Sequence, residues 1–235
     1  MPQHWVGRVF RSPAWLAALC LAVSATVLVQ PPEPARAAVL VDAPASAGVI
    51  ADASLLAAVS DGSAMLSLPW TEGETWRLTG GPHPERFGTK HPWSAIDLQP
   101  KDAQPGKVRA ARAGIVHRPC PNMVEIRHDG GWTSVYYHLR NIPVRDGQWV
   151  PRGAMLGWTS TRSGCGGYAS GPHLHFSLKW HGDFINLRGN AIGGWTVREG
   201  DAPYDGCLVR NGARRCAPKG LLRNLGLIGN GAASG

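Results

Sequence analysis

The length, composition and charge of the chain narrow the classes of protein to which it can belong. Its 235 residues suffice for one domain of ordinary size with a short extension. The 30 Gly and 19 Pro residues indicate many turns and short strands, and no long amphipathic helix is visible. The net charge is +8, but no run of Lys and Arg and no motif of stacking aromatic residues indicates RNA or DNA binding, so we expect no nucleic-acid partner.

The N-terminal region has the pattern of an export signal. Arg8 and Arg11 form a basic start, and an uncharged apolar run covers residues 15–29. A proline-rich stretch follows, and Ala35-Arg36-Ala37 fits the small-x-small pattern of signal cleavage, so residues 1–37 are predicted to be a signal peptide. A transmembrane anchor is the alternative, although the apolar run is short for crossing a bilayer.

Export determines how the mature chain is interpreted. We expect a secreted, extracellular monomer that has no stable membrane association after signal cleavage. The mature chain stays basic, which suits association with an anionic polymer such as a cell wall, although a generally basic proteome would give the same charge.

The cysteines fit an oxidising compartment. The mature chain keeps an even set of four, Cys120, Cys165, Cys207 and Cys216. Cys207 and Cys216 are close in sequence within a tail that we expect to be irregular, so we pair them, and therefore Cys120 with Cys165. A zinc site of four cysteines is the competing interpretation, but no C-x-x-C pair is present.

The remaining sequence divides into a short leader and one β-rich domain. Residues 38–66 are rich in Ala and Ser and are predicted to be a pro-segment or linker, and residues 67–235 form the domain. Short strand-like runs recur there between Gly, Pro and Asp-Gly turns, which predicts an all-β, antiparallel single domain built of hairpins. Two long irregular segments, 80–92 and 159–172, are expected to flank a groove. The predicted strands are 93–98, 107–111, 114–118, 124–128, 133–139, 148–150, 154–158, 173–180 and 184–187.

Two histidines one residue apart form the most informative motif. His173, Leu174 and His175 open a predicted strand, so both imidazoles project from the same face while Leu174 faces a core. Such a pair suits one metal ligand beside one catalytic or orienting group. Two histidines on a half-exposed strand without a task are the alternative.

Further ligand types occur elsewhere in the chain. A catalytic zinc site needs three His or carboxylate ligands and one open position. His83 follows Gly-Gly-Pro, Asp97 lies between Ile96 and Leu98 in a buried strand, and His138 ends an aromatic strand. A buried Asp requires a cation or several donors. A capping or ion-paired Asp97 and a hydrogen-bonded His138 are the structural alternatives.

Several motifs resemble one protein family. They are Val135-Tyr136-Tyr137-His138-Leu139, the spacing Gly147…Gly153…Leu156-Gly157, and Gly171-Pro172-His173-Leu174-His175-Phe176. With Gly81-Pro82-His83 and Tyr204-Asp205-Gly206-Cys207, they resemble the lysostaphin-type zinc endopeptidases, in particular the staphylolysin and β-lytic branch. The resemblance covers about residues 67–225.

The resemblance implies a site. Zn²⁺ would be bound by His83, Asp97 and His175, while His138 and His173 would be catalytic histidines off the metal. Tyr137 or Tyr204 would be a further oxyanion donor or a packing residue. Many members have the spacing His-x-x-x-Asp, whereas fourteen positions separate His83 from Asp97 here, so His91 is the alternative ligand.

The resemblance also implies an activity. We expect a secreted zinc metalloendopeptidase that hydrolyses peptide bonds in peptidoglycan cross-links or stem peptides, including Gly-containing bonds, with peptidoglycan peptides as partners. The alternatives are a non-catalytic cell-wall-binding or regulatory module of the same fold, and a secreted protease that acts on Gly-rich proteins.

Overall fold

The computed structural model describes residues 66–85 and 91–226. The predicted signal peptide, and all but the last residue of the segment 38–66, lie outside the described residues. Leu66, the last residue of that segment, is 2% exposed and packs in the core of the domain. Across the two described ranges, no helix is both long enough and apolar enough to traverse a bilayer.

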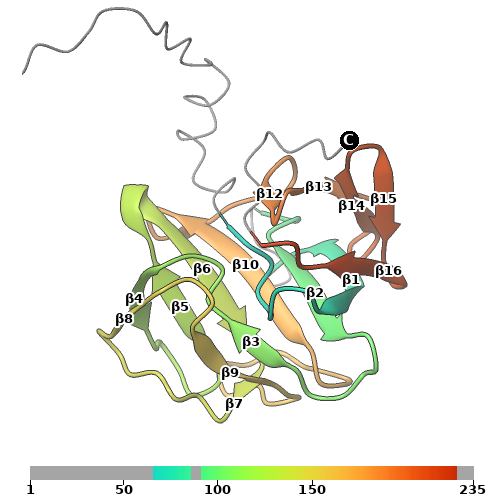
Figure 1. Ribbon diagram of the computed structural model, residues 1–235. Coiled ribbons are helices and arrows are strands. Elements are labelled where there is room, and N and C mark those ends of the chain that lie inside the picture. The colour runs from blue at the N-terminus through green and yellow to red at the C-terminus, as the bar shows by residue number, and fades with distance from the viewer. Residues whose placement is uncertain (1–65, 86–90, 227–235) are drawn as a thin grey trace, which may run out of the picture. The chain divides into compact units, whose positions relative to one another are not determined.

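The largest sheet is antiparallel and follows the order β16-β1-β2-β10-β6-β5-β4-β8, with β11 paired to β10 (Figure 1). The described residues contain one 3₁₀ turn, Asp129–Gly131, and no α-helix, so the predicted all-β class is confirmed. The strands of this sheet are β1 (Thr75–His83), β2 (Ala95–Pro100), β4 (Gly114–His117), β5 (Val124–Arg127), β6 (Trp132–Tyr137), β8 (Trp149–Val150), β10 (Leu174–Trp180), β11 (Asp183–Phe184) and β16 (Gly220–Arg223).

Two smaller antiparallel sheets complete the domain. One has the order β3-β9-β7, and the other has the order β12-β13-β14-β15 and lies beside β1 and β16 (Figure 1). Their strands are β3 (Lys107–Arg109), β7 (Leu139–Arg140), β9 (Met155–Thr159), β12 (Ala191–Ile192), β13 (Trp195–Glu199), β14 (Gly206–Arg210) and β15 (Ala213–Cys216).

The C-terminal tail is not irregular, and that expectation was wrong. Residues 191–216 form the β12–β15 sheet, and Cys207 lies directly opposite Cys216 in the β14–β15 pair. These strands have only two to five residues, and β15 has no buried residue, so hydrophobic alternation was a weak signal. The disulfide Cys207–Cys216 is confirmed.

Each of the nine predicted strands has an observed counterpart, but β1 and β16 were missed, as were β12–β15. Gly80–Pro92 was expected to be irregular, whereas β1 continues through Gly80-Gly81-Pro82 to His83. Two register shifts against β2, between Leu78 and Gly80 and between Gly80 and His83, accommodate these residues. Gly and Pro usually interrupt strands, and bulges of this kind are where a strand tolerates them.

The core lies under one face of β10. Leu174, Phe176 and Leu178 are at most 1% exposed and belong to the main hydrophobic cluster. His175 and Ser177 alternate with them and therefore project from the opposite face, as the sequence predicts. Burying apolar surface stabilises the fold by about 25 cal/mol per Å². This stabilisation fixes the strand in its register, because a slip of one residue would turn the polar face toward the core.

A polar network links β5 and β6 to the segment before β4. The Nδ1 of His128 donates to the Ala113 carbonyl at 2.8 Å, and its Nε2 lies 2.8 Å from the Ser134 hydroxyl. The Ser134 hydroxyl is also 2.8 Å from the Tyr136 hydroxyl, which accepts from the Ala111 amide. Burial, together with the nearby charge of Arg112, lowers the pKa of His128 to about 4.

His128 should make the fold sensitive to acid. In the unfolded chain His128 takes up a proton as the pH falls through 6.5, whereas in the folded protein it resists protonation until about pH 4. The contribution of His128 to the unfolding free energy is therefore fully present above pH 6.5 and is lost as the pH falls from 6.5 to about 4. We expect about 2 kcal/mol less unfolding free energy from this group at pH 5 than at pH 7. Urea unfolding with a chelator present, compared with a His128→Asn variant, measures the difference, and equal pH slopes in both proteins would contradict it.

Candidate metal centre

Four neighbouring strands bring the predicted site residues together. The backbone register places Gly80 opposite Asp97, Asp97 opposite His175, and His175 opposite Tyr137. His83 ends β1, three residues beyond Gly80, where the strand shifts register. Cross-strand neighbours on β1, β2, β10 and β6 therefore form one row, in which residues up to 95 positions apart in sequence lie side by side.

Three ligand atoms meet at this row. His83 Nε2 lies 3.3 Å from His175 Nδ1 and 3.5 Å from Asp97 Oδ1, and His175 Nδ1 lies 3.1 Å from Asp97 Oδ1. Neighbouring ligands of a tetrahedral zinc ion with bonds of about 2.0–2.2 Å are separated by about 3.3–3.6 Å. The donor set therefore fits zinc, with two of the three separations inside this range and the third, 3.1 Å between His175 Nδ1 and Asp97 Oδ1, slightly shorter. Within the described ranges no other group of three His, Cys, Asp or Glu residues has ligand atoms this close together.

The alternative ligand His91 does not join the cluster. The ligand atoms that lie within 4.8 Å of one another belong to His83, Asp97 and His175. The long spacing between His83 and Asp97 is accommodated because β1 and β2 are antiparallel neighbours, which places the end of one strand beside the start of the other.

The electrostatics of the cluster favour a bound cation. Although burial would raise it, hydrogen bonding to His175 and the nearby His83 hold the pKa of Asp97 at about 2. Burial lowers the pKa of His83. Burial would also lower the pKa of His175, but hydrogen bonds to Asp97 and Glu85 raise it to about 10, so a proton occupies the cluster in the absence of metal.

Glu85 contacts a candidate ligand, and the sequence analysis did not single it out. The Nε2 of His175 donates to Glu85 Oε2 at 2.7 Å, and the Ser177 hydroxyl donates to the same oxygen at 2.7 Å. Burial would raise the pKa of Glu85, but these bonds hold it below its usual value. Glu85 lies two residues after His83 in a segment expected to be irregular, but nothing in the sequence alone pairs it with His175 or Ser177.

The two remaining histidines lie beside the cluster. His138 Nδ1 donates to the Arg162 carbonyl at 2.9 Å, and His173 Nδ1 donates to the Gly171 carbonyl at 2.9 Å. Each ring therefore keeps the lone pair of Nε2 for other partners. The rings are 4.7 Å apart, and His173 Nε2 is 3.5 Å from Asp97 Oδ1. Burial lowers the pKa of His138 to about 4.

A cavity of about 720 Å³ opens over the cluster. Its walls include all five predicted site residues and the loop between β9 and β10, from which Tyr168 projects with 84% exposure. The disulfide Cys120–Cys165 anchors this loop and is confirmed. The expected groove over the sheet is therefore present.

The two tyrosines have different surroundings. The Tyr137 hydroxyl donates to the Gly166 carbonyl at 2.6 Å and accepts from the Cys165 amide at 2.9 Å, so it holds the loop between β9 and β10. Tyr204 stacks on His83, with ring centroids 4.1 Å apart. Burial and the charge of Asp97 raise the pKa of Tyr204.

Comparison with known proteins adds an independent observation. The profile described as Peptidase family M23 matches residues 91–187, which include every predicted site residue except His83. The chain is 32% identical over 167 residues to the beta-lytic metalloendopeptidase of Lysobacter enzymogenes, with 66% of this chain and 93% of that protein covered. It is 34% identical over 157 residues to protease LasA of Pseudomonas aeruginosa, with 63% of this chain covered but only 37% of LasA.

Two further similarities differ in extent. The peptidoglycan DD-endopeptidase ShyA of Vibrio cholerae is 32% identical over 120 residues, with 47% of this chain and 26% of ShyA covered. The solved structure of the M23 metalloprotease pseudoalterin from the deep sea superposes with a TM-score of 0.62 and 31% identity, covering 68% of this chain and 98% of that one.

A methyl group at Gly80 should disturb the cluster. A Cβ atom built there would lie 2.8 Å from Asp97 Oδ2, so Gly80→Ala forces the carboxylate to move. We expect zinc affinity to fall by about tenfold or more. Gly171→Ala is the control, because its Cβ would meet nothing closer than Gln99 Nε2 at 3.9 Å. Competition with a chromogenic chelator measures both variants, and equal affinities would contradict the placement of Asp97.

Proposed function

Since the chain belongs to peptidase family M23, we propose that it is a secreted zinc endopeptidase that hydrolyses peptide bonds of bacterial peptidoglycan. The observation that carries this proposal is the meeting of three ligand atoms at distances of 3.1 to 3.5 Å beside two histidines that keep Nε2 free of intramolecular backbone bonds. Secretion rests on the predicted signal peptide, residues 1–37.

The ligands in this proposal are His83 Nε2, Asp97 Oδ1 and His175 Nδ1. Zinc bound there would act as a Lewis acid that polarises a peptide carbonyl and would bring the pKa of a water toward about 7. His83 Nδ1 lies 2.8 Å from the Gly81 carbonyl, to which it donates, so its Nε2 is the unprotonated nitrogen that a metal requires.

His138 and His173 handle the protons. As the attacking water oxygen bonds to the carbonyl carbon, the lone pair of a neutral imidazole Nε2 accepts the proton of the water. The same proton then passes to the leaving amine as the C–N bond breaks. The low pKa of His138, about 4, keeps this ring neutral near pH 7 and available as a base. The backbone carbonyls on both Nδ1 atoms hold the rings in that tautomer.

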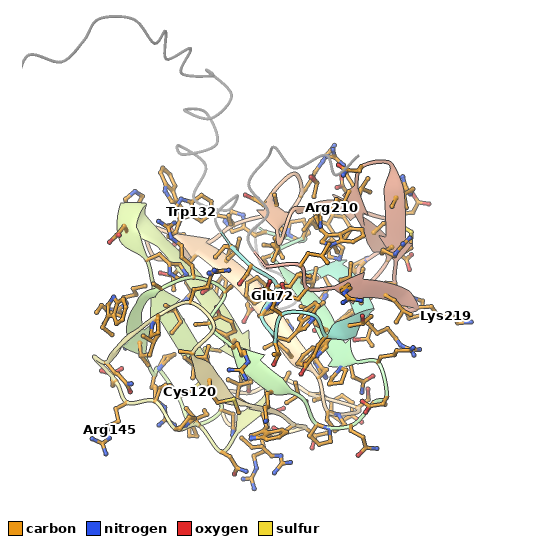
Figure 2. All side chains as sticks on the ribbon, in the orientation of Figure 1. Glu72, Cys120, Trp132, Arg145, Arg210 and Lys219 are labelled. Carbon is orange, nitrogen blue, oxygen red and sulfur yellow. A yellow bond between two sulfur atoms is a disulfide. The ribbon has the colours of Figure 1, made fainter. Side chains whose placement is uncertain are left out.

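Peptidoglycan as the substrate is supported by three observations. A relative named for peptidoglycan endopeptidase activity shares 32% identity. Basic side chains are spread over the surface, where Arg145 and Lys219 project into solvent on different sides (Figure 2). The cavity over the cluster has a volume of about 720 Å³ and is lined in part by the highly exposed Tyr168, so it is open to a substrate from solvent. The preference for Gly-containing bonds rests on the family resemblance alone.

Two alternatives make different predictions. A non-catalytic wall-binding module would not need the complete set of ligands and catalytic histidines, all of which line one cavity here. A secreted protease for Gly-rich proteins would share the chemistry and differ in its substrate. Measuring the metal content distinguishes the proposed enzyme from the first alternative, and measuring which substrates are cut distinguishes it from the second.

Ligand and catalytic histidines should respond differently to substitution. We expect His175→Ala to lose bound zinc and activity, because one of three ligands is removed. His138→Ala and His173→Ala should retain about one zinc ion per chain but lose about 10²–10⁴-fold in kcat, the usual contribution of a general acid or base. Metal analysis by mass spectrometry and peptide hydrolysis measure both effects. Full activity of His175→Ala would refute the ligand assignment.

The substrate is tested directly with purified cell walls. Walls with different cross-link chemistry are digested with the zinc-loaded protein, and mass analysis identifies the newly formed termini. We expect new amino termini within cross-links or stem peptides. Failure to cut any wall type, combined with hydrolysis of Gly-rich proteins, would replace this substrate with the second alternative.

A further inference from the structure

Glu85 is a buried acid that no part of the proposed chemistry uses. Its side chain is 8% exposed, and the imidazole that it contacts belongs to a side chain that is 10% exposed. A buried carboxylate is costly unless it is paired and hydrogen bonded. Both bonds that the structure gives it, from His175 Nε2 and from the Ser177 hydroxyl, end on Oε2.

We propose that Glu85 is a positioning residue that fixes the orientation and tautomer of His175 so that Nδ1 faces the metal. The inference rests on the proposed function, because it assumes that His175 is a zinc ligand. The two ring nitrogens of His175 are engaged on opposite sides: Nε2 lies 2.7 Å from Glu85, and Nδ1 lies 3.1 Å from Asp97 and 3.3 Å from His83.

The orientation of the ring depends on the Glu85 contact. If the imidazole of His175 turned over, a carbon atom would face the Glu85 oxygen, and a second carbon atom would replace Nδ1 in the cluster. The bond to Glu85 therefore selects the orientation in which a nitrogen points to the metal. A carboxylate that accepts from one ring nitrogen also keeps the proton there and leaves the lone pair on the other nitrogen.

Ser177 and the backbone make this arrangement rigid. Ser177 is fully buried and follows His175 by two residues, so both side chains lie on the same face of β10. Glu85 follows the ligand His83 by two residues, and its amide donates to the Ser94 hydroxyl at 2.9 Å. The end of β1 and the two residues after it therefore supply both a ligand and the acid that orients a second ligand on β10.

Charge gives Glu85 a second effect on the site. His83 and His175 are neutral as ligands, so Asp97 alone would leave a zinc ion with one uncompensated positive charge. The Glu85 carboxylate, held against the distal nitrogen of His175, balances that charge and increases the basicity of Nδ1. Acids in this position commonly strengthen metal binding by about 10–100-fold.

The test compares zinc affinity and the tautomer of His175 in three variants. We expect Glu85→Ala to bind zinc about 10–100-fold more weakly than the unmodified protein in chelator competition. Glu85→Gln, which accepts from Nε2 but has no charge, should lose less, and Ser177→Ala, which keeps the carboxylate, should lose least. Nitrogen-15 NMR of zinc-loaded protein should show a proton on Nε2 of His175 that exchanges slowly, and Glu85→Ala should make that exchange fast.

A matched control removes a buried acid elsewhere in the same sheet. Glu125 in β5 is 6% exposed and pairs with Lys179 at 2.6 Å, away from the cluster. Glu125→Gln should leave zinc affinity unchanged, which distinguishes positioning from a general loss of stability. If Glu85→Ala does not fold, the nearly isosteric Glu85→Gln decides the question.

The outcomes separate the two proposals. Unchanged zinc affinity and unchanged Nε2 proton exchange in the Glu85 variants would overturn the positioning role while the proposed function stands. Failure of the unmodified protein to bind zinc would instead overturn the proposed function. Equal loss of affinity in Glu85→Gln and in Glu125→Gln would also overturn the positioning role, because the effect would then not depend on the contact with His175.

Discussion

The register of β1, β2 and β10 is the constraint on which the site depends. Each strand contributes one candidate ligand, and pairing between strands, rather than a local motif, brings the three candidate ligands together. That register is set by the other face of the sheet, where Leu174 and Phe176 are fully buried. The apolar core and the metal cluster are therefore two consequences of one alternation, and neither can shift without the other.

Opposing charges then tune the cluster that the register creates. Asp97 and Glu85 both contact His175, and both carboxyl groups have a pKa below the usual value because of that contact. In the absence of metal the imidazole keeps a proton between the two acids, so metal binding releases it. Asp97 and Glu85 are better explained as two buried acids that hold either a proton or a metal ion than as partners in a structural ion pair. The reason is that His83 adds a third ligand atom, 3.3 Å from His175 Nδ1.

Much of this arrangement could be predicted from the sequence, and the parts that could not be predicted have physical reasons. Alternation along 173–178 predicts both the core face and the polar face of β10, and the even cysteine count of a chain predicted to be exported indicates disulfides. The extension of β1 to His83 escapes prediction because bulges absorb Gly and Pro. The β12–β15 sheet escapes because its strands are short and partly exposed. Glu85 escapes because its partners, His175 and Ser177, are about 90 positions away, and single-sequence patterns report neighbours only.

The two walls of the cavity differ in how they are held, and this difference bears on function. The ligand side is a continuous sheet, whereas the opposite wall is the loop between β9 and β10, fastened by Cys165 and by the Tyr137 hydroxyl. His138 depends on the same loop, because Nδ1 donates to the Arg162 carbonyl within it. Under the proposed function, fastening the loop therefore orients the base His138 as well as shaping the groove. Under the proposed function, the ligands are therefore held by strands, whereas the proton-transferring His138 is held by a tethered loop.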